Sequence, residues 1–144
     1  MWKEFIKNIS EGYILVEPAM ENEIHKLEKI FSVEISNELK TFLSESNGVY
    51  DTYKCPIIWS VKQIIEENSN LRKYEHFKDI YMPFDCLLFV ADAGNGDLFG
   101  YSILNGIVQK DDIYVWNHED DSRTWVASSL KKFIKGWTDG TISV

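Results

Sequence analysis

The chain has 144 residues, of which 44% are apolar and 14% aromatic, so we expect one globular domain, 1–144, with one hydrophobic core. Its 23 acidic residues outnumber its 15 basic ones and give a formal net charge of −8, which argues against direct binding to nucleic acid, because phosphate contacts need surplus Lys and Arg. No apolar run approaches the roughly 18 residues of a membrane span, and no signal-peptide core is visible, so we expect a cytoplasmic protein that does not bind membranes.

Three segments near the N-terminus carry apolar residues at helical spacing. The first is expected to end near Gly12, the second to have Pro18 in its first turn, and the third to be capped by Ser36 and stopped by Asn47-Gly48. The third helix is predicted to turn Leu39, Phe42 and Leu43 inward. The apolar residues at helical spacing in the first two segments are Trp2, Phe5, Ile6, Ile9, Met20, Ile24, Leu27 and Phe31.

The middle of the chain begins with a short extended segment, Ile57-Ile58-Trp59. Ser60 is placed to cap a helix that follows it, and we expect Asn68-Ser69-Asn70 to interrupt that helix because Asn and Ser compete for backbone hydrogen bonds.

A hairpin is predicted next. The apolar run Leu87–Ala91 is typical of a buried strand, and Leu98–Tyr101 resumes as a second strand. Between them, Asp92-Ala93-Gly94-Asn95-Gly96-Asp97 has the composition of a turn. Cys86 precedes the first strand and is predicted to be a core thiol; neither it nor Cys55 belongs to a Cys-x-x-Cys pair, so a zinc site or disulfide framework is unsupported.

Ile113–Trp116 alternates as a strand does, and a polar loop, Asn117–Asp121, follows it. Ser122 is predicted to cap a final helix that carries Trp125, Val126, Leu130, Phe133, Ile134 and Trp137. The order of helices, strands and a last helix favours an α+β fold over a doubly wound sheet. The predicted core includes Leu27, Phe42, Leu88, Val90, Phe99, Val115, Leu130 and Phe133.

The glycine-rich hairpin tip does not match a known ligand loop. Gly94-x-Gly96-x-x-x-Gly100 is one residue too long for a dinucleotide fingerprint, and Asp92 and Asp97 would repel phosphate. The spacing of an EF-hand is also absent. We therefore expect no bound cofactor or nucleotide, and predict that Asp92 and Asp97 hydrogen-bond backbone groups.

The loop His118-Glu119-Asp120-Asp121 has residue types that bind metals or exchange protons. Neither His25 nor His76 lies in a segment that would complete a metal site, so a solvated acidic loop is the preferred interpretation. No local pattern marks a catalytic nucleophile, and we expect no catalytic or metal-binding residue. An enzyme or small-ligand protein that uses these loops is kept as an alternative.

Three segments, in this order, resemble the SUKH superfamily of Smi/Knr-like domains over about residues 18–137. They are Ile24-x-x-Leu27-Glu28 with Leu39-x-x-Phe42-Leu43-x-x-x-Asn47-Gly48, then Leu88–Phe99, then Ile113–Glu119 with the helix after it. The resemblance implies a single α+β domain with a central, largely antiparallel or mixed sheet flanked by helices. It also implies function by binding: bacterial members resemble immunity proteins that neutralise toxin domains, often nucleases, and fungal relatives are similar to regulators of cell-wall glucan synthesis.

These observations favour a non-enzymatic immunity protein whose partner is a basic toxin domain, with a regulatory scaffold as the alternative. The acidic loops, Asp92–Asp97 and Asp111–Asp121, would supply electrostatic attraction, and aromatic residues would supply the anchoring area. The predicted partner-binding residues are Asp92, Asn95, Asp97, Tyr101, Tyr114, Trp116, His118, Glu119, Asp120 and Asp121. No oligomeric state is predicted.

Overall fold

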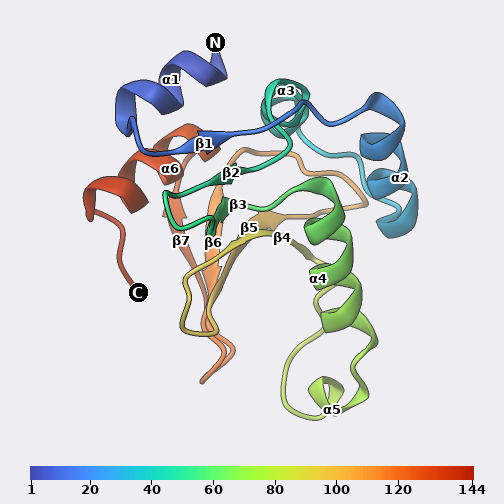
Figure 1. Ribbon diagram of the computed structural model, residues 1–144. Helices are drawn as coiled ribbons and strands as arrows, with labels where there is room; N and C mark the ends of the chain where they lie inside the picture. Colours follow the sequence, from blue (N-terminus) through green and yellow to red (C-terminus); the bar gives the residue numbers. More distant parts are fainter.

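A computed structural model describes residues 1–144 as an α+β domain with two antiparallel sheets (Figure 1). The helices are α1 (Trp2–Ile9), α2 (Glu21–Phe31), α3 (Asn37–Glu45), α4 (Val61–Lys73), α5 (Glu75–Lys78) and α6 (Leu130–Asp139). The strands are β1 (Ile14–Leu15), β2 (Val49–Tyr50), β3 (Pro56–Ile58), β4 (Leu87–Asp92), β5 (Leu98–Ser102), β6 (Ile113–Trp116) and β7 (Arg123–Ala127). None of the helices is both long and apolar enough to span a membrane.

The strands form a three-stranded sheet, β1-β2-β3, and a four-stranded sheet, β4-β5-β6-β7, in which all neighbours are antiparallel. The predicted fold class is confirmed, although the central sheet is divided in two. The backbone N–H of Trp59, just after β3, donates to the carbonyl of Val90 in β4 at 2.8 Å and so joins the two sheets.

One hydrophobic core lies between the sheets and the helices, and all eight residues predicted for it are buried. Helix α6 packs on the four-stranded sheet through Phe99, whose ring lies 4.6 Å from that of Phe133 and 5.2 Å from that of Trp137. Beside the other sheet, α1 packs against α3 through Trp2 and Phe42, whose rings meet edge to face at 5.2 Å. Burial of these large side chains is the main favourable contribution to stability.

Two predicted helix caps are confirmed. The Ser36 hydroxyl accepts from the Leu39 N–H, and the Ser60 hydroxyl accepts from the Gln63 N–H. The predicted start of the second helix is wrong, because α2 begins at Glu21 and Pro18 lies before it. Met20, expected to continue the apolar spacing of this helix, is the exposed residue that precedes it. Its N–H is held by the Glu23 carboxylate at 2.9 Å, and this hydrogen bond fixes the start of the helix.

The prediction that Ser122 caps a final helix is wrong. Residues Arg123–Ala127 form strand β7, and the helix starts seven residues later, capped by Ser129. Pairing with β6 decides the conformation, because Trp125 lies opposite Tyr114 and Thr124 opposite Val115. As a result Trp125, which was predicted to lie on that helix, is 53% exposed.

The expected interruption at Asn68-Ser69-Asn70 is also wrong, since α4 continues to Lys73. Asn68 is buried, and its side-chain amide donates to the carbonyls of Ile64 and Phe89, both at 2.8 Å, and accepts from the Phe89 N–H at 2.9 Å. These bonds satisfy the polar groups of Asn68, so it can stand inside a helix.

Cys86 was predicted to be a core thiol, but it and Cys55 are both exposed. The buried run begins one residue later, at Leu87. The Cys86 sulfur lies 3.3 Å from Nη1 of Arg123, on the surface of the molecule.

Candidate protein-binding surface

Three connections meet at one end of the four-stranded sheet, at the bottom of Figure 1. They are the β4–β5 tip (residues 93–97), the β6–β7 loop (residues 117–122) and the strap, by which we mean residues 79–86 between α5 and β4. Hydrogen bonds between side chains and backbone join the three connections into one surface, which we call the loop end.

Asp97 and His118 join the tip to the β6–β7 loop. Asp97 is only 4% exposed, and its Oδ1 accepts from the His118 N–H at 3.2 Å and lies 2.7 Å from the ring Nδ1. The ring also lies against Gly96, where a Cβ atom would come within 2.9 Å of it. The prediction that Asp97 bonds the backbone is therefore confirmed, but the group it bonds is on the neighbouring loop.

Asp92 does not bond the backbone of the turn. Its Oδ2 accepts from the indole N–H of Trp59 at 3.1 Å. Within the tip the turn is held by Asn95, whose side-chain oxygen accepts from the Asp97 N–H at 3.0 Å. The tip is thus held by the bond of Asn95 within the turn, by the bond of Asp97 to His118 and by the bond of Asp92 to Trp59.

The strap is fixed to the β6–β7 loop. The Tyr81 hydroxyl donates to the His118 carbonyl at 2.7 Å, and the Met82 N–H donates to Asp121 at 2.9 Å. Arg123 donates to the carbonyls of Met82 and Pro83 and to Asp121. A single guanidinium therefore bonds both the strap and the loop.

Asp121 is ionised in this setting. Burial by itself would raise the pKa of its carboxyl, but the Met82 N–H, the Trp116 indole N–H and the Arg123 guanidinium outweigh burial and hold the pKa below its usual value. The Asp121 carboxylate thus links the β6–β7 loop to the strap and to Trp116.

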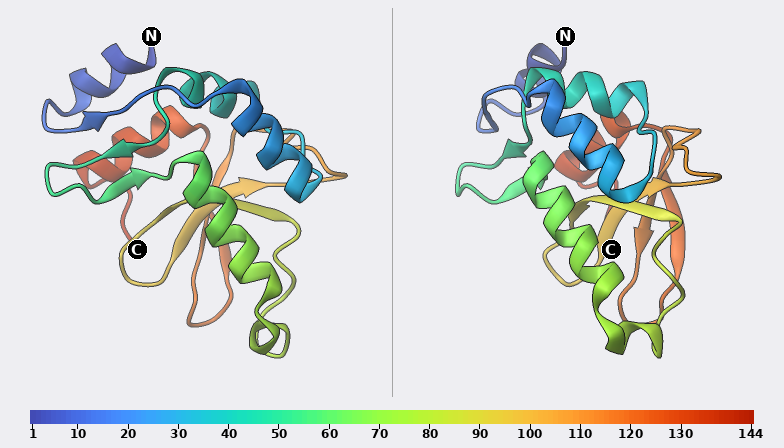
Figure 2. Two further views of the ribbon diagram at one scale, coloured as in Figure 1. Left: turned by 45° about the vertical axis from the view of Figure 1, so that its right-hand side comes forward. Right: turned by 90° about the vertical axis from the view of Figure 1, so that its right-hand side faces the viewer.

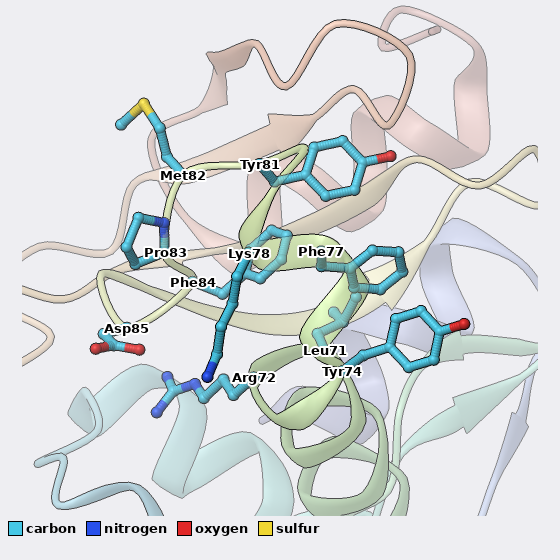
Figure 3. A pocket seen from close by; sticks show the side chains of 10 residues that line it. All are labelled: Leu71, Arg72, Tyr74, Phe77, Lys78, Tyr81, Met82, Pro83, Phe84 and Asp85. Atoms are coloured by element: carbon cyan, nitrogen blue, oxygen red, sulfur yellow. The ribbon is translucent and has the colours of Figure 1, made fainter.

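Aromatic rings pack in a continuous series beneath the strap, with neighbouring centroids 4.7–6.4 Å apart. The series consists of Tyr74, Phe77, Tyr81, Phe84, Phe89 and Trp116. Four of these rings, those of Tyr74, Phe77, Tyr81 and Phe84, line an open groove of about 400 Å³. In Figure 3 the rings of Tyr74, Phe77 and Tyr81 line one side of this groove, and Arg72, Lys78 and Asp85 lie on the other.

The structure brings some predicted partner-binding residues together and removes others from the surface. Asn95, Glu119 and Asp120 are exposed at the loop end, where Asp92, His118 and Asp121 are half-buried. Tyr101 and Trp116 are buried and cannot contact a partner, and Asp97 is buried with them. Tyr114 is half-buried on β6, away from the groove.

The predicted acidic stretch from Asp111 to Asp121 is not one patch. Strand β6 separates Asp111 and Asp112, at its start, from Glu119 and Asp120, which follow its end. Four extended residues span about 13 Å, which exceeds the distance over which salt screens charges.

Two features of the surface were missed in the sequence. The strap was not recognised, although Tyr74, Phe77, Tyr81 and Phe84 recur at three- and four-residue spacing. Trp125 was assigned to a helix; it lies beside Tyr114 on the outer strand, and its indole N–H donates to Asp112 at 3.0 Å.

The titratable groups at the loop end are engaged with one another. No three His, Cys, Asp or Glu side chains gather closely enough to hold a metal ion. The His118 ring is bonded to Asp97, and Asp121 is bonded to Arg123. The exposed carboxylates are those of Glu119 and Asp120, and Asp120 also accepts from the Ser122 N–H at 2.9 Å.

The fold, with its helices around antiparallel sheets, is that of an α+β domain of the SUKH type. A family model described as SUKH_6, SMI1-KNR4 cell-wall, matches residues 21–134, which is most of the chain. The chain therefore belongs to the SMI1-KNR4 family, as the resemblance in its sequence predicted. No curated protein matches it.

Proposed function

We propose that this protein is a non-enzymatic, cytoplasmic immunity protein that binds and neutralises a basic toxin domain, such as a nuclease. The observation that carries the proposal is the contrast at the loop end. The strap and the two loops are held by hydrogen bonds, whereas the carboxylates of Glu119 and Asp120 are left exposed.

Rigid loops favour tight binding because less conformational entropy is lost when the complex forms. The exposed carboxylates and the net charge of −8 would attract a basic partner and speed its encounter. Beside them, Tyr74 and Met82 line the groove and are 52% and 63% exposed, so they offer the apolar area that charges at the rim do not supply.

A non-enzymatic role is supported by the use of the polar side chains. Asp97, His118, Asp121 and Arg123 bond one another or the backbone of the strap, and such bonds hold loops in place. A general base, by contrast, needs to reach the proton of a substrate.

The test uses the protein encoded by the neighbouring open reading frame, because immunity genes are expected beside toxin genes. A double variant, Glu119→Gln with Asp120→Asn, should associate with that protein about threefold to tenfold more slowly at low salt, and the difference should shrink at high salt. Surface-plasmon kinetics would measure both rates. The wild-type protein should also restore growth to cells that express the toxin.

A matched variant, Glu4→Gln with Glu11→Gln, removes the same charge from exposed positions at the other end of the molecule and should leave the rate nearly unchanged. Substitutions at Asp92, Asp97 and Asp121 are left out because their carboxylates bond other elements of the fold. Asp120 bonds only the Ser122 N–H of its own loop, and Asp120→Asn keeps a side-chain oxygen that can accept this bond. Absence of binding to the neighbouring gene product, or equal rates for both double variants, would count against the proposal.

The second candidate is a regulatory scaffold for cell-wall glucan synthesis, and the description of the family model favours it. In that case deletion of the gene should change the sensitivity of cells to wall-active compounds, and the protein should not rescue growth from any neighbouring toxin.

A further inference from the structure

The two edge strands of the four-stranded sheet, β4 and β7, differ in whether their outward backbone groups have hydrogen-bond partners. On the β4 side, the Asn68 amide takes both backbone hydrogen bonds of Phe89, as a neighbouring strand would. The carbonyls of Val90 and Leu87 are bonded by the Trp59 N–H and by Nη2 of Arg72. This edge is therefore closed by the protein itself.

The β7 edge has no such cover. β7 is the last strand in the sheet order and has no strand on its outer side. No hydrogen bond reaches the backbone of residues 123–127 except from β6. In an antiparallel pair, alternate residues of an edge strand direct their N–H and C=O groups outward. In Figure 2 (right), β7, drawn in orange-red, forms the outer margin of the sheet.

Two of the devices that protect edge strands are absent from β7, although the strand is short and its ladder with β6 shifts register opposite Ile113 and Tyr114. β7 has no proline, and its single cation, Arg123, is turned to the strap and Asp121. Between Asp111 and Ser122 there is no Lys or Arg. The edge of β7 therefore has unpaired backbone groups, and the segment that precedes it in the chain carries carboxylates and no Lys or Arg.

Trp125 adds an aromatic anchor to this edge. It is 53% exposed, lies opposite the half-buried Tyr114, and is held in place by the bond from its indole N–H to Asp112. A tryptophan ring is the best aromatic partner for a Lys or Arg side chain, and a nearby carboxylate strengthens the attraction. Carboxylates lie near both ends of β7, with Glu119 and Asp120 before it and Asp112 beside Trp125.

We infer that β7 binds an extended segment of a partner protein, which adds to the sheet as a further antiparallel or parallel strand and places a Lys or Arg side chain on Trp125. The inference rests on the proposed function, in which the partner is a basic protein, and specifies how such a partner docks. Backbone hydrogen bonds would supply affinity, and the cation on Trp125 would supply selectivity.

The probe is a synthetic octapeptide of alternating Lys and Val, compared with a matched peptide of alternating Glu and Val. Amide hydrogen exchange of the ¹⁵N-labelled protein reports which backbone groups become protected. We expect the Lys peptide to slow exchange at residues 123–127 and the Glu peptide to have no effect. Trp125→Ala should weaken binding of the Lys peptide about fivefold to tenfold.

Tyr53→Ala is the matched control, because Tyr53 is an aromatic residue that is 86% exposed on another part of the surface. It should bind the Lys peptide as the wild type does. Equal binding by Trp125→Ala, equal binding of the two peptides, or no protection at β7 would overturn the inference. Protection of β7 that grows with protein concentration without peptide would also overturn it, since a second copy of the chain would then be the occupant.

The outcome can be separated from that of the proposed function. If the neighbouring gene product binds Trp125→Ala as tightly as the wild type, the docking mode is wrong and the proposed function stands. If the peptide binds at β7 but the neighbouring gene product does not bind at all, the proposed function is wrong.

Discussion

Oε1 of Glu38 accepts a hydrogen bond from the hydroxyl of the fully buried Tyr101 at 3.2 Å and another from the Leu130 N–H at 2.7 Å. One carboxylate thus joins α3, β5 and the start of α6. Burial raises the pKa of Glu38 above its ordinary 4.5, with a further contribution from Asp111, although the bonds from Leu130 and Tyr101 oppose the rise.

This arrangement predicts a pH dependence of stability. Because the folded state holds the Glu38 proton more tightly than the unfolded chain does, its contribution is fully present below about pH 4.5 and is lost as the pH rises through the folded-state pKa. Glu38→Gln keeps an acceptor but does not ionise. We therefore expect its free energy of unfolding to rise relative to the wild type between about pH 4 and pH 7, as measured by urea titration. Glu11→Gln at an exposed position controls for the change in net charge, and a constant difference across this range would contradict the assignment.

Replacing Asn68 by Ala should destabilise the protein by about 3 kcal/mol. The change leaves the N–H and C=O of Phe89 buried without a partner, and each unsatisfied group costs about 1–3 kcal/mol. Asn70→Ala, at an exposed position on the same helix, should cost less than about 0.5 kcal/mol. Equal unfolding midpoints for the two variants in urea would show that Asn68 does not hold the strand.

Gly100 in β5 is expected to tolerate no side chain. A Cβ atom there would overlap the backbone carbonyl of Leu88 on the paired strand, and backbone in a sheet has little room to move. Gly100→Ala should therefore lower stability by about 3 kcal/mol. Gly94→Ala, where no atom is near but φ is +88°, should cost about 1 kcal/mol from backbone strain alone. A smaller loss at Gly100 than at Gly94 in thermal unfolding would disprove the steric explanation.

Arg123→Lys should loosen the strap without unfolding the domain, because a single ammonium group cannot reproduce the bonds to Met82, Pro83 and Asp121. The amide of Met82 should exchange with solvent about tenfold faster, which corresponds to a loss of about 1.4 kcal/mol in local stability. Lys73→Ala, at an exposed position in α4, should leave that rate unchanged. Hydrogen exchange followed by mass spectrometry measures both rates. An unchanged exchange rate of Met82 in Arg123→Lys would indicate that aromatic packing, and not Arg123, holds the strap in place.

The parts of the fold that were predicted correctly are set by local chemistry. Ser36 and Ser60 cap helices through residues three positions away, and the β4–β5 hairpin follows from two apolar runs around a Gly and Asn turn. Trp125 and Asn68 were misassigned because distant partners decide them. Trp125 continues the apolar spacing of the last helix, but pairing with Tyr114 makes it part of a strand, and the bonds of Asn68 to Phe89 span 21 positions.

The candidate surface was predicted in part, for a similar reason. Glu119 and Asp120 are exposed because a polar loop between two strands lies at the surface. Trp116 is buried because Tyr81 and Phe84 of the strap cover it. No pattern in the sequence around Trp116 indicates that these distant residues pack on it. Asp97 and Asp121 were likewise predicted to contact a partner, whereas in the folded chain they are paired with His118 and Arg123.

Closure of the β4 edge limits how copies of this sheet can assemble. An open filament grows when each unit offers one edge of its sheet and accepts at the other. Here Asn68, Trp59 and Arg72 occupy the backbone groups of β4, so the four-stranded sheet has one edge to offer. A strand that docks on β7 ends the sheet in that complex, and two copies that meet through β7 form a closed pair. The buried asparagine therefore protects the protein from indefinite edge-to-edge polymerisation while β7 is left open.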